Sequence, residues 1–151
     1  MRHPLHVVVA LSELGDFRDE VRQVFRELGR TFSAESLAPE CTPALDVYET
    51  DDRVEIVVDL PGVDASAIRV IARGDSVLIA GDKAPRRAPG DSSFHLVERG
   101  YGRFARVIRL ERPCNPSGAR AQVLGGELRV SLPTVVERRG AAIPIRIVAG
   151  A

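Results

Sequence analysis

Apolar and polar residues alternate between Arg53 and Leu60, which is the clearest pattern in the chain. Successive side chains of a β-strand point to opposite faces, so this period of two predicts a half-buried antiparallel strand. Glu55 and Asp59 lie on the polar side of the alternation. Pro61-Gly62 ends the strand, because proline lacks the N–H that a ladder needs and glycine tolerates the turn.

The same design recurs from Pro43 to Pro133, where short apolar or alternating runs are separated by turn residues. Turns at intervals of about eight to twelve residues are typical of an all-β sandwich. Gly81 is expected to close one of these strands, and a long exposed loop is expected over 82–93. Besides 53–60, the predicted strands are 44–48, 68–72, 77–80, 103–110, 119–123 and 128–132, with 94–97 as a further short candidate.

A second kind of period begins at Asp16, where apolar residues recur at the spacing of an amphipathic helix of about three turns. We expect Asp16 to cap this helix and Gly29 to end it. Two placements are open: the helix docks on the domain's own core, or it is a sticky arm that packs on other chains. Its apolar stripe consists of Phe17, Val21, Val24, Phe25 and Leu28.

Breaks in these periods divide the chain. We expect an N-terminal arm with the helix and a linker over 1–42, a β-sandwich over 43–133 and a C-terminal extension over 134–151. The extension places Ile143, Ile145 and Ile147 on one side of an extended segment, and Pro144 pre-sets that form. Burying one such side chain is worth roughly 1.5–3 kcal/mol. The tail therefore either folds back on its own domain or docks into a groove on another subunit.

The composition is that of an ordinary globular chain of 151 residues, 44% hydrophobic and 28% charged. Basic and acidic residues balance at 21 each, so no global field favours nucleic acid, and self-assembly is compatible with the zero net charge. No apolar run is long enough to span a bilayer, and Leu5–Leu11 is short for a secretion signal. Cys41 and Cys114 are too few for a disulfide framework, which favours reduced thiols in a cytoplasm.

Candidate catalytic groups are sparse. The sequence lacks the glycine-rich phosphate loop that is common in ATP-using proteins. A dyad of Cys114 and His95 is conceivable, but nothing in the sequence places the two together. His3 and His6 have a spacing that could chelate a metal weakly. We therefore expect no enzyme, no cofactor and no metal site.

Several blocks resemble the alpha-crystallin domain of small heat-shock proteins, in that family's order. The run from Glu98 to Arg106 is similar to the family's E-R-x-Y-G-x-F-x-R signature, with Gly100 in the first x position. Ile143-Pro144-Ile145 matches its C-terminal I-x-I motif. One departure is visible at 110–113, where the chain has Leu-Glu-Arg-Pro and the family commonly has Leu-Pro. The resembling blocks are 43–49, 58–63, 77–81, 98–106, 121–128 and 143–145.

The resemblance implies an immunoglobulin-like antiparallel β-sandwich with an N-terminal helical arm and an extended C-terminal tail. It also implies an ATP-independent chaperone that holds unfolding client proteins and assembles as dimers into larger homo-oligomers. The dimer would form by exchange of the 94–97 strand onto the partner's 44–48 edge. The implied interface residues are Arg106, Phe94, His95, Leu96, Val97, Leu45 and Val47, and the implied tail-docking groove is lined by Val70, Ala72, Ala121 and Val123.

Arg106 matches the family's arginine and lies on the same side of its strand as Phe104 and Ile108. An unpaired buried charge costs several kcal/mol. We therefore expect Arg106 to form an interface ion pair with a carboxylate, and an ordinary exposed charge is the alternative.

Two other classes of protein are the alternatives to a small heat-shock protein. A co-chaperone or adaptor sandwich would bind one folded partner and would not need the apolar tail motif at 143–147. A hydrolase would need a nucleophile and a base, and the sequence offers no recognisable set.

Overall fold

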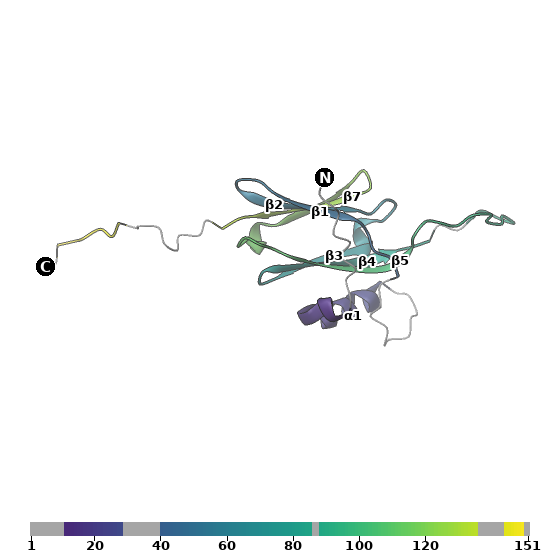
Figure 1. Cartoon of the computed structure of the whole chain (residues 1–151), viewed down its shortest axis with the longest axis horizontal. Helices are drawn as coiled ribbons and strands as arrows, with labels where there is room; N and C mark the ends of the chain where they lie inside the picture. Colours follow the sequence, from purple (N-terminus) through teal and green to yellow (C-terminus); the bar gives the residue numbers. More distant parts are fainter. Residues whose placement is uncertain (1–10, 29–39, 86–87, 136–143, 150–151) are drawn as a thin grey trace.

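The computed structural model describes residues 11–28, 40–85, 88–135 and 144–149, with side chains from residue 14 onward in the first range. Figure 1 shows three layers: a sheet that contains β1, β2 and β7, a sheet of β3, β4 and β5, and helix α1 outside the second sheet. All neighbouring strands are antiparallel. The antiparallel β-sandwich and the short N-terminal helix are thereby confirmed.

Within the described residues, the strands form two sheets with the orders β1-β2-β7-β6 and β3-β4-β5. Most predicted strands are found within a few residues of their expected bounds. The strands are β1 (Leu45–Glu49), β2 (Arg53–Asp59), β3 (Ile68–Arg73), β4 (Ser76–Lys83), β5 (Gly102–Arg109), β6 (Arg120–Leu124) and β7 (Glu127–Pro133). The helices are α1 (Arg18–Glu27) and the short 3-10 turns η1 (Leu11–Phe17), η2 (Ala65–Ala67) and η3 (Pro116–Gly118).

The main core lies between the two sheets and follows from the alternation. On β2, Val54, Ile56 and Val58 are buried, whereas Arg53 and Asp59 are exposed. Slipping the strand by one residue would turn this whole apolar set toward water, so the register is strongly specified. The other buried core residues are Leu60, Val63, Ile68, Val77, Ile79, Phe104, Ile108, Leu110, Leu128, Val130 and Leu132.

Gly81 does not end its strand, and that prediction is wrong: β4 continues to Lys83. A Cβ atom on Gly81 would lie 2.3 Å from the carbonyl oxygen of Ala67 and 2.6 Å from the ring of Phe104. Phe104 is the cross-strand partner of Gly81 on β5 and is fully buried. The glycine therefore makes room for a large core side chain inside the strand.

Residues 94–97 do not form a strand in this single chain, contrary to the prediction. They lie in the connection between β4 and β5, which Figure 1 shows as a loop that projects from one end of the sandwich. Phe94, Leu96 and Val97 are between 64% and 73% exposed. A strand needs a ladder partner, and no strand of the described part of the chain pairs with this segment.

Helix α1 packs on the outer face of the β3–β4–β5 sheet (Figure 1). Its N-cap residue is Phe17 and not Asp16, because the 3-10 turn η1 leads directly into the helix. The predicted cap at Asp16 is therefore wrong, and Gly29 lies outside the described residues. Of the two placements left open by the sequence, this chain adopts the one in which the helix docks on its own domain.

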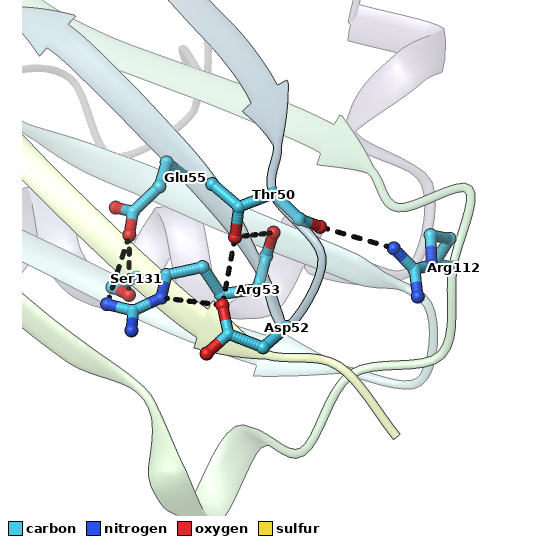
Figure 2. A network of polar contacts seen from close by, with 6 residues as sticks. All are labelled: Thr50, Asp52, Arg53, Glu55, Arg112 and Ser131. Atoms are coloured by element: carbon cyan, nitrogen blue, oxygen red, sulfur yellow. Dashed lines mark hydrogen bonds and ion pairs between the residues drawn. The ribbon is translucent and has the colours of Figure 1, made fainter. Parts of the chain in front are cut away.

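A network of polar side chains fixes the turn between β1 and β2, as Figure 2 shows. Asp52 accepts hydrogen bonds from Thr50 Oγ1 at 3.0 Å and from Arg53 Nε at 3.2 Å. The bond from Arg53 is the main reason that the pKa of the Asp52 carboxyl lies below its ordinary value. Ser131 Oγ on β7 donates to the Glu55 carboxylate on β2 at 2.9 Å. The network therefore links the turn to the neighbouring strand of the same sheet.

Arg112 joins the same network and accommodates the departure from the family pattern at 110–113. Its Nη1 atom lies 3.4 Å from the carbonyl oxygen of Thr50 (Figure 2) and 3.5 Å from the carboxylate of Glu49. Leu110 remains buried, and its N–H donates to the carbonyl of Asp75 at 2.7 Å. Leu110 thus keeps a core position, and Arg112 ties the residues that follow it to the end of β1.

The sandwich continues slightly past its predicted end at residue 133. The N–H of Thr134 donates to the carbonyl of Asp52 at 2.9 Å, and the N–H of Val135 donates to the carbonyl of Pro113 at 2.8 Å. Thr134 also forms an isolated bridge with Cys114. Backbone contacts therefore attach the start of the C-terminal extension to the domain.

Candidate functional site

Two edge strands, β3 and β6, carry the residues expected to line the tail-docking groove. Each is the last strand of its sheet. Val70 and Val123 are half-buried and pack against the common core from opposite sheets. Ala72 and Ala121 are exposed and lie on the same strand faces as these valines, because side chains repeat every two residues. All four therefore face the inner side of the sandwich at its edges, and their contact with a tail stays a prediction.

The described part of the tail motif lies in solvent. Ile145 is 88% exposed and Ile147 is 93% exposed. Pro144 is also exposed, and Ile143 lies outside the described residues. Of the two alternatives for the tail, folding back on its own domain is not what these residues do. Each such side chain would gain roughly 1.5–3 kcal/mol on burial, so the tail retains capacity to bind.

The loop between β4 and β5 is a second exposed apolar surface. It encloses a hollow of about 560 Å³ whose lining is mostly apolar. His95, which was predicted at the interface with its neighbours, is exposed but does not line this hollow. The apolar lining residues are Pro85, Ala88, Pro89, Phe94, Leu96, Val97 and Tyr101.

Strand β1 presents an edge that pairs with no other strand in the described part of the chain. Leu45 is half-buried against the core, whereas Val47 on the same strand face is 44% exposed. Tyr48, on the opposite face, is 47% exposed. Open edges invite pairing with another chain, and Asp46 and Glu49 place charges there that limit non-specific pairing.

Arg106 reaches from β5 toward the first sheet. Its Nη1 atom donates to the carbonyl oxygen of Pro43, just before β1, at 2.6 Å. The side chain projects from the core-facing side of β5, as Phe104 and Ile108 do. One bonding partner seen here is thus a backbone carbonyl of the same chain. An ion pair between Arg106 and a second chain stays a prediction.

The residues predicted as a client or assembly arm are buried on their own domain, where they meet an apolar sheet face. The sequence analysis missed this receiving face. The uninterrupted apolar run Val77–Ala80 was the signal for this face. Successive side chains of a strand point to opposite faces, so a strand that is apolar at every position is covered on both sides. The buried arm residues are Phe17, Val21, Val24 and Phe25, with Leu28 half-buried, and they pack with Leu14 on Leu78, Ala80 and Ala105.

Neither cysteine is prepared for nucleophilic chemistry. Burial is the main reason that the pKa of Cys41 and that of Cys114 lie above the ordinary value of 9.0, which favours the unreactive thiol. Both are free thiols. Cys114 lies beside Thr134, whereas His95 lies on the projecting loop, so the conceivable dyad is not formed.

The described residues offer neither a metal-binding cluster nor a membrane-spanning helix. They contain no group of three or more His, Cys, Asp or Glu side chains placed to hold a metal ion. His3 and His6 lie outside the described ranges. The helices described here are too short or too polar to cross a membrane.

Comparisons with known proteins agree with the fold and with the blocks. Residues 46–147 match the Hsp20/alpha crystallin family. Spore protein SP21 of Stigmatella aurantiaca is 33% identical over 95 residues, which are 63% of this chain and 56% of that protein. The 17.8 kDa class I heat shock protein of Solanum lycopersicum is 33% identical over 125 residues, or 81% of this chain and 80% of that protein.

The solved structure of a small heat-shock protein from Xylella fastidiosa aligns with a TM-score of 0.60 and 28% identity. The alignment covers 74% of this chain and 99% of that one. The sandwich, the sequence blocks and these matches together show that the chain belongs to the Hsp20/alpha crystallin family of small heat-shock proteins.

Proposed function

We propose that the protein is an ATP-independent holdase, which binds partially unfolded proteins and prevents their aggregation. The observation that carries this proposal is the amount of apolar side chain that one chain leaves in water. Leu96 is 73% exposed on the projecting loop, and Ile145 and Ile147 are 88% and 93% exposed on the tail. Such surfaces mark interaction sites, and a partially unfolded client exposes apolar surface of its own.

The same surfaces support assembly into dimers and larger homo-oligomers. In the dimer, the 94–97 segment of one chain adds to the free β1 edge of its partner and gains the ladder that it lacks alone. In the larger assembly, Ile143 and Ile145 of one subunit dock between β3 and β6 of another. Both contacts bury side chains that are otherwise in water, so their formation is favoured by the hydrophobic effect.

This mechanism does not require ATP hydrolysis. Binding to an unfolding client by mass action lowers the concentration of the species that aggregates. The cytoplasm is the proposed location, and the free thiols of Cys41 and Cys114 suit its reducing conditions.

The test is to heat a labile client with the full chain at stoichiometric amounts and follow light scattering, with and without ATP. The expected result is suppressed scattering that is unchanged by ATP. Undiminished scattering, or suppression that depends on ATP, would contradict the proposal. A single complex of fixed size with one folded partner, and no effect on client aggregation, would identify an adaptor instead.

The dimer contact has its own test. Leu96→Asp places a charge in the loop and should shift native mass toward the monomer. Ser93→Asp is the matched control, because Ser93 is an exposed polar residue of the same loop and should retain the wild-type mass. Equal masses for the two variants would contradict the proposed strand exchange.

A further inference from the structure

The outer face of the β3–β4–β5 sheet is apolar, although it would be the solvated side of an ordinary two-sheet sandwich. Leu78, Ala80 and Ala105 on this face are at most 2% exposed, and Ile71 and Val107 pack beside them. The antiparallel sheets of a sandwich commonly keep such a face polar. This face is therefore built to be covered.

Arginines lie at the border of this apolar surface and contact helix α1, which covers it. Arg73 forms an ion pair with Glu20 of α1, donates to the carbonyl of Asp16 at 2.7 Å and lies 5.4 Å from the ring centroid of Phe17. Arg69 Nε lies 3.7 Å from the carboxylate of Glu27. These contacts come from the strand face that also carries Ile71, because side chains on a strand alternate.

A third arginine contacts the helix from the far strand. Arg103 of β5 lies 5.2 Å from the ring centroid of Phe25, and its charge is paired with Glu40 at 3.6 Å. The positive charge that the rim offers to an occupant therefore comes from Arg69 and Arg73 of β3. An occupant with carboxylates beside its apolar stripe can bury that stripe on the surface and pair its carboxylates with the arginines of the rim.

Helix α1 has that chemistry, with Val21, Val24 and Phe25 facing the sheet and Glu20 and Glu27 meeting the arginines. Its hold on the sheet comes mainly from its buried apolar side chains. The ion pairs are half-exposed, and such pairs contribute little to stability. The helix has 10 residues, and isolated helices of this length are marginal in water. The helix belongs to neither sheet, so its release would leave the ladders of hydrogen bonds between the strands intact.

We propose that this arginine-rimmed face is a binding site for amphipathic segments of client proteins, and that α1 occupies it in the resting chain. The proposal rests on the holdase function above and names its substrate class: helical segments with an apolar stripe flanked by carboxylates. Because α1 and a client segment need the same side chains of the sheet, their binding is mutually exclusive. Displacement of α1 opens the site.

The test uses the full chain and a fluorescein-labelled peptide with the sequence of residues 14–28, followed by fluorescence anisotropy. Val21→Asp removes the driving force for docking α1, since Val21 is fully buried. This variant should bind the peptide at least about tenfold more tightly than the wild type, whose site is largely occupied. Arg18→Asp is the matched control, because Arg18 is exposed on the same helix and the wild-type affinity should persist.

Charge selectivity gives the second readout. A peptide with Glu20→Arg and Glu27→Arg should bind the Val21→Asp chain more weakly than the unaltered peptide. Adding Arg69→Glu and Arg73→Glu to the protein should reverse that preference, a result that general stickiness would not produce. If Val21→Asp binds no better than Arg18→Asp, or if both peptides bind equally, the proposal is wrong.

Circular dichroism and urea unfolding check that the variants stay folded. If Val21→Asp unfolds the sandwich, a full chain with Glu20→Arg and Glu27→Arg replaces it, since those changes weaken only the rim contacts. That chain should bind the unaltered peptide more tightly than the wild-type chain does, and equal affinity would overturn the proposal. The peptide assay is independent of light scattering, so a chain that binds peptide without suppressing aggregation would refute the holdase function alone.

Discussion

Arg106 is the residue whose role changes most between sequence and structure. Its guanidinium donates to the carbonyl of Pro43 at 2.6 Å and thereby connects β5 to the start of β1. A sequence pattern cannot reveal this partner, because a backbone carbonyl carries no residue-type signal. The alternation did place Arg106 on the core-facing side of its strand, which is what brings it within reach of Pro43.

Arg106→Ala is expected to lower the free energy of unfolding by about 1.5–3 kcal/mol, the usual range for a hydrogen bond to a charged group. Arg109→Ala is the control, because that side chain is 84% exposed and forms a surface ion pair with Asp75. Its effect should stay within about 0.5 kcal/mol. Urea unfolding of both variants measures the difference. Similar losses in the two would contradict the role given to the Pro43 contact.

The Cys41 thiol yields a prediction on pH. Its pKa is raised above 9.0, mainly by burial, so the unfolded chain loses this proton at a lower pH than the folded one. The stability contributed by the neutral thiol is therefore lost as the pH rises above that value. Urea unfolding at pH 8 and pH 10 should show a smaller loss for Cys41→Ser than for the wild type. An equal loss would contradict the predicted linkage.

At the scale of single elements, β4 shows what a strand requires when it is covered on both sides. Its inner face meets the other sheet and its outer face meets α1. Within it, Gly81 lies against the ring of Phe104, where any side chain would collide. The glycine was expected to close the strand, and only the cross-strand partner reveals why a glycine stands there.

Gly81→Ala is expected to destabilise the fold by about 1–3 kcal/mol, the typical cost of overpacking a core. The added Cβ would stand 2.3 Å from the Ala67 carbonyl oxygen, and backbone cannot yield as a flexible side chain can. Gly100→Ala is the matched control, because its Cβ would meet only Cys41 at 3.7 Å, an ordinary contact distance. Thermal unfolding compares the two, and equal melting temperatures would contradict this interpretation.

Elements with a strong local period were predictable, whereas elements that depend on a partner were not. The alternation gave β2, β5 and β7 close to their observed bounds, and the helical stripe gave α1. The 94–97 segment has apolar residues suited to a strand, yet hydrogen bonding in a strand depends on a neighbour that the single chain does not supply. The face on which α1 docks was not predicted from Val77–Ala80. An uninterrupted apolar run has no periodicity to show what covers each of its two faces.

At the scale of the whole molecule, the tail is expected to decide the size of the assembly. Ile143-x-Ile145 and Ile145-x-Ile147 are overlapping copies of one motif, and a slip of two residues keeps isoleucines facing a groove. The first copy is the predicted main register and the second a weaker one. Ile145 belongs to both.

Ile145→Ala should therefore reduce native mass most, at a cost of about 2–5 kcal/mol for each docked side chain that is fully buried. Ile147→Ala should have a mild effect and serves as the control, since the two side chains are 88% and 93% exposed in the single chain. Native mass spectrometry of both variants at several concentrations decides the order. If Ile147→Ala dissociates the assembly as completely as Ile145→Ala, the predicted register is wrong.

Helix α1 and the face that it covers belong to one polypeptide, joined through residues 29–39. A tethered ligand acts at an effective concentration on the order of millimolar. A client segment of equal intrinsic affinity at micromolar concentration would therefore compete against an effective concentration of α1 that is about a thousandfold higher. Warming shifts this balance toward any client helix that is more stable than α1, because the tether helps α1 only while α1 remains helical. On the proposal above, the melting of one short helix would set the temperature at which the chain begins to accept clients.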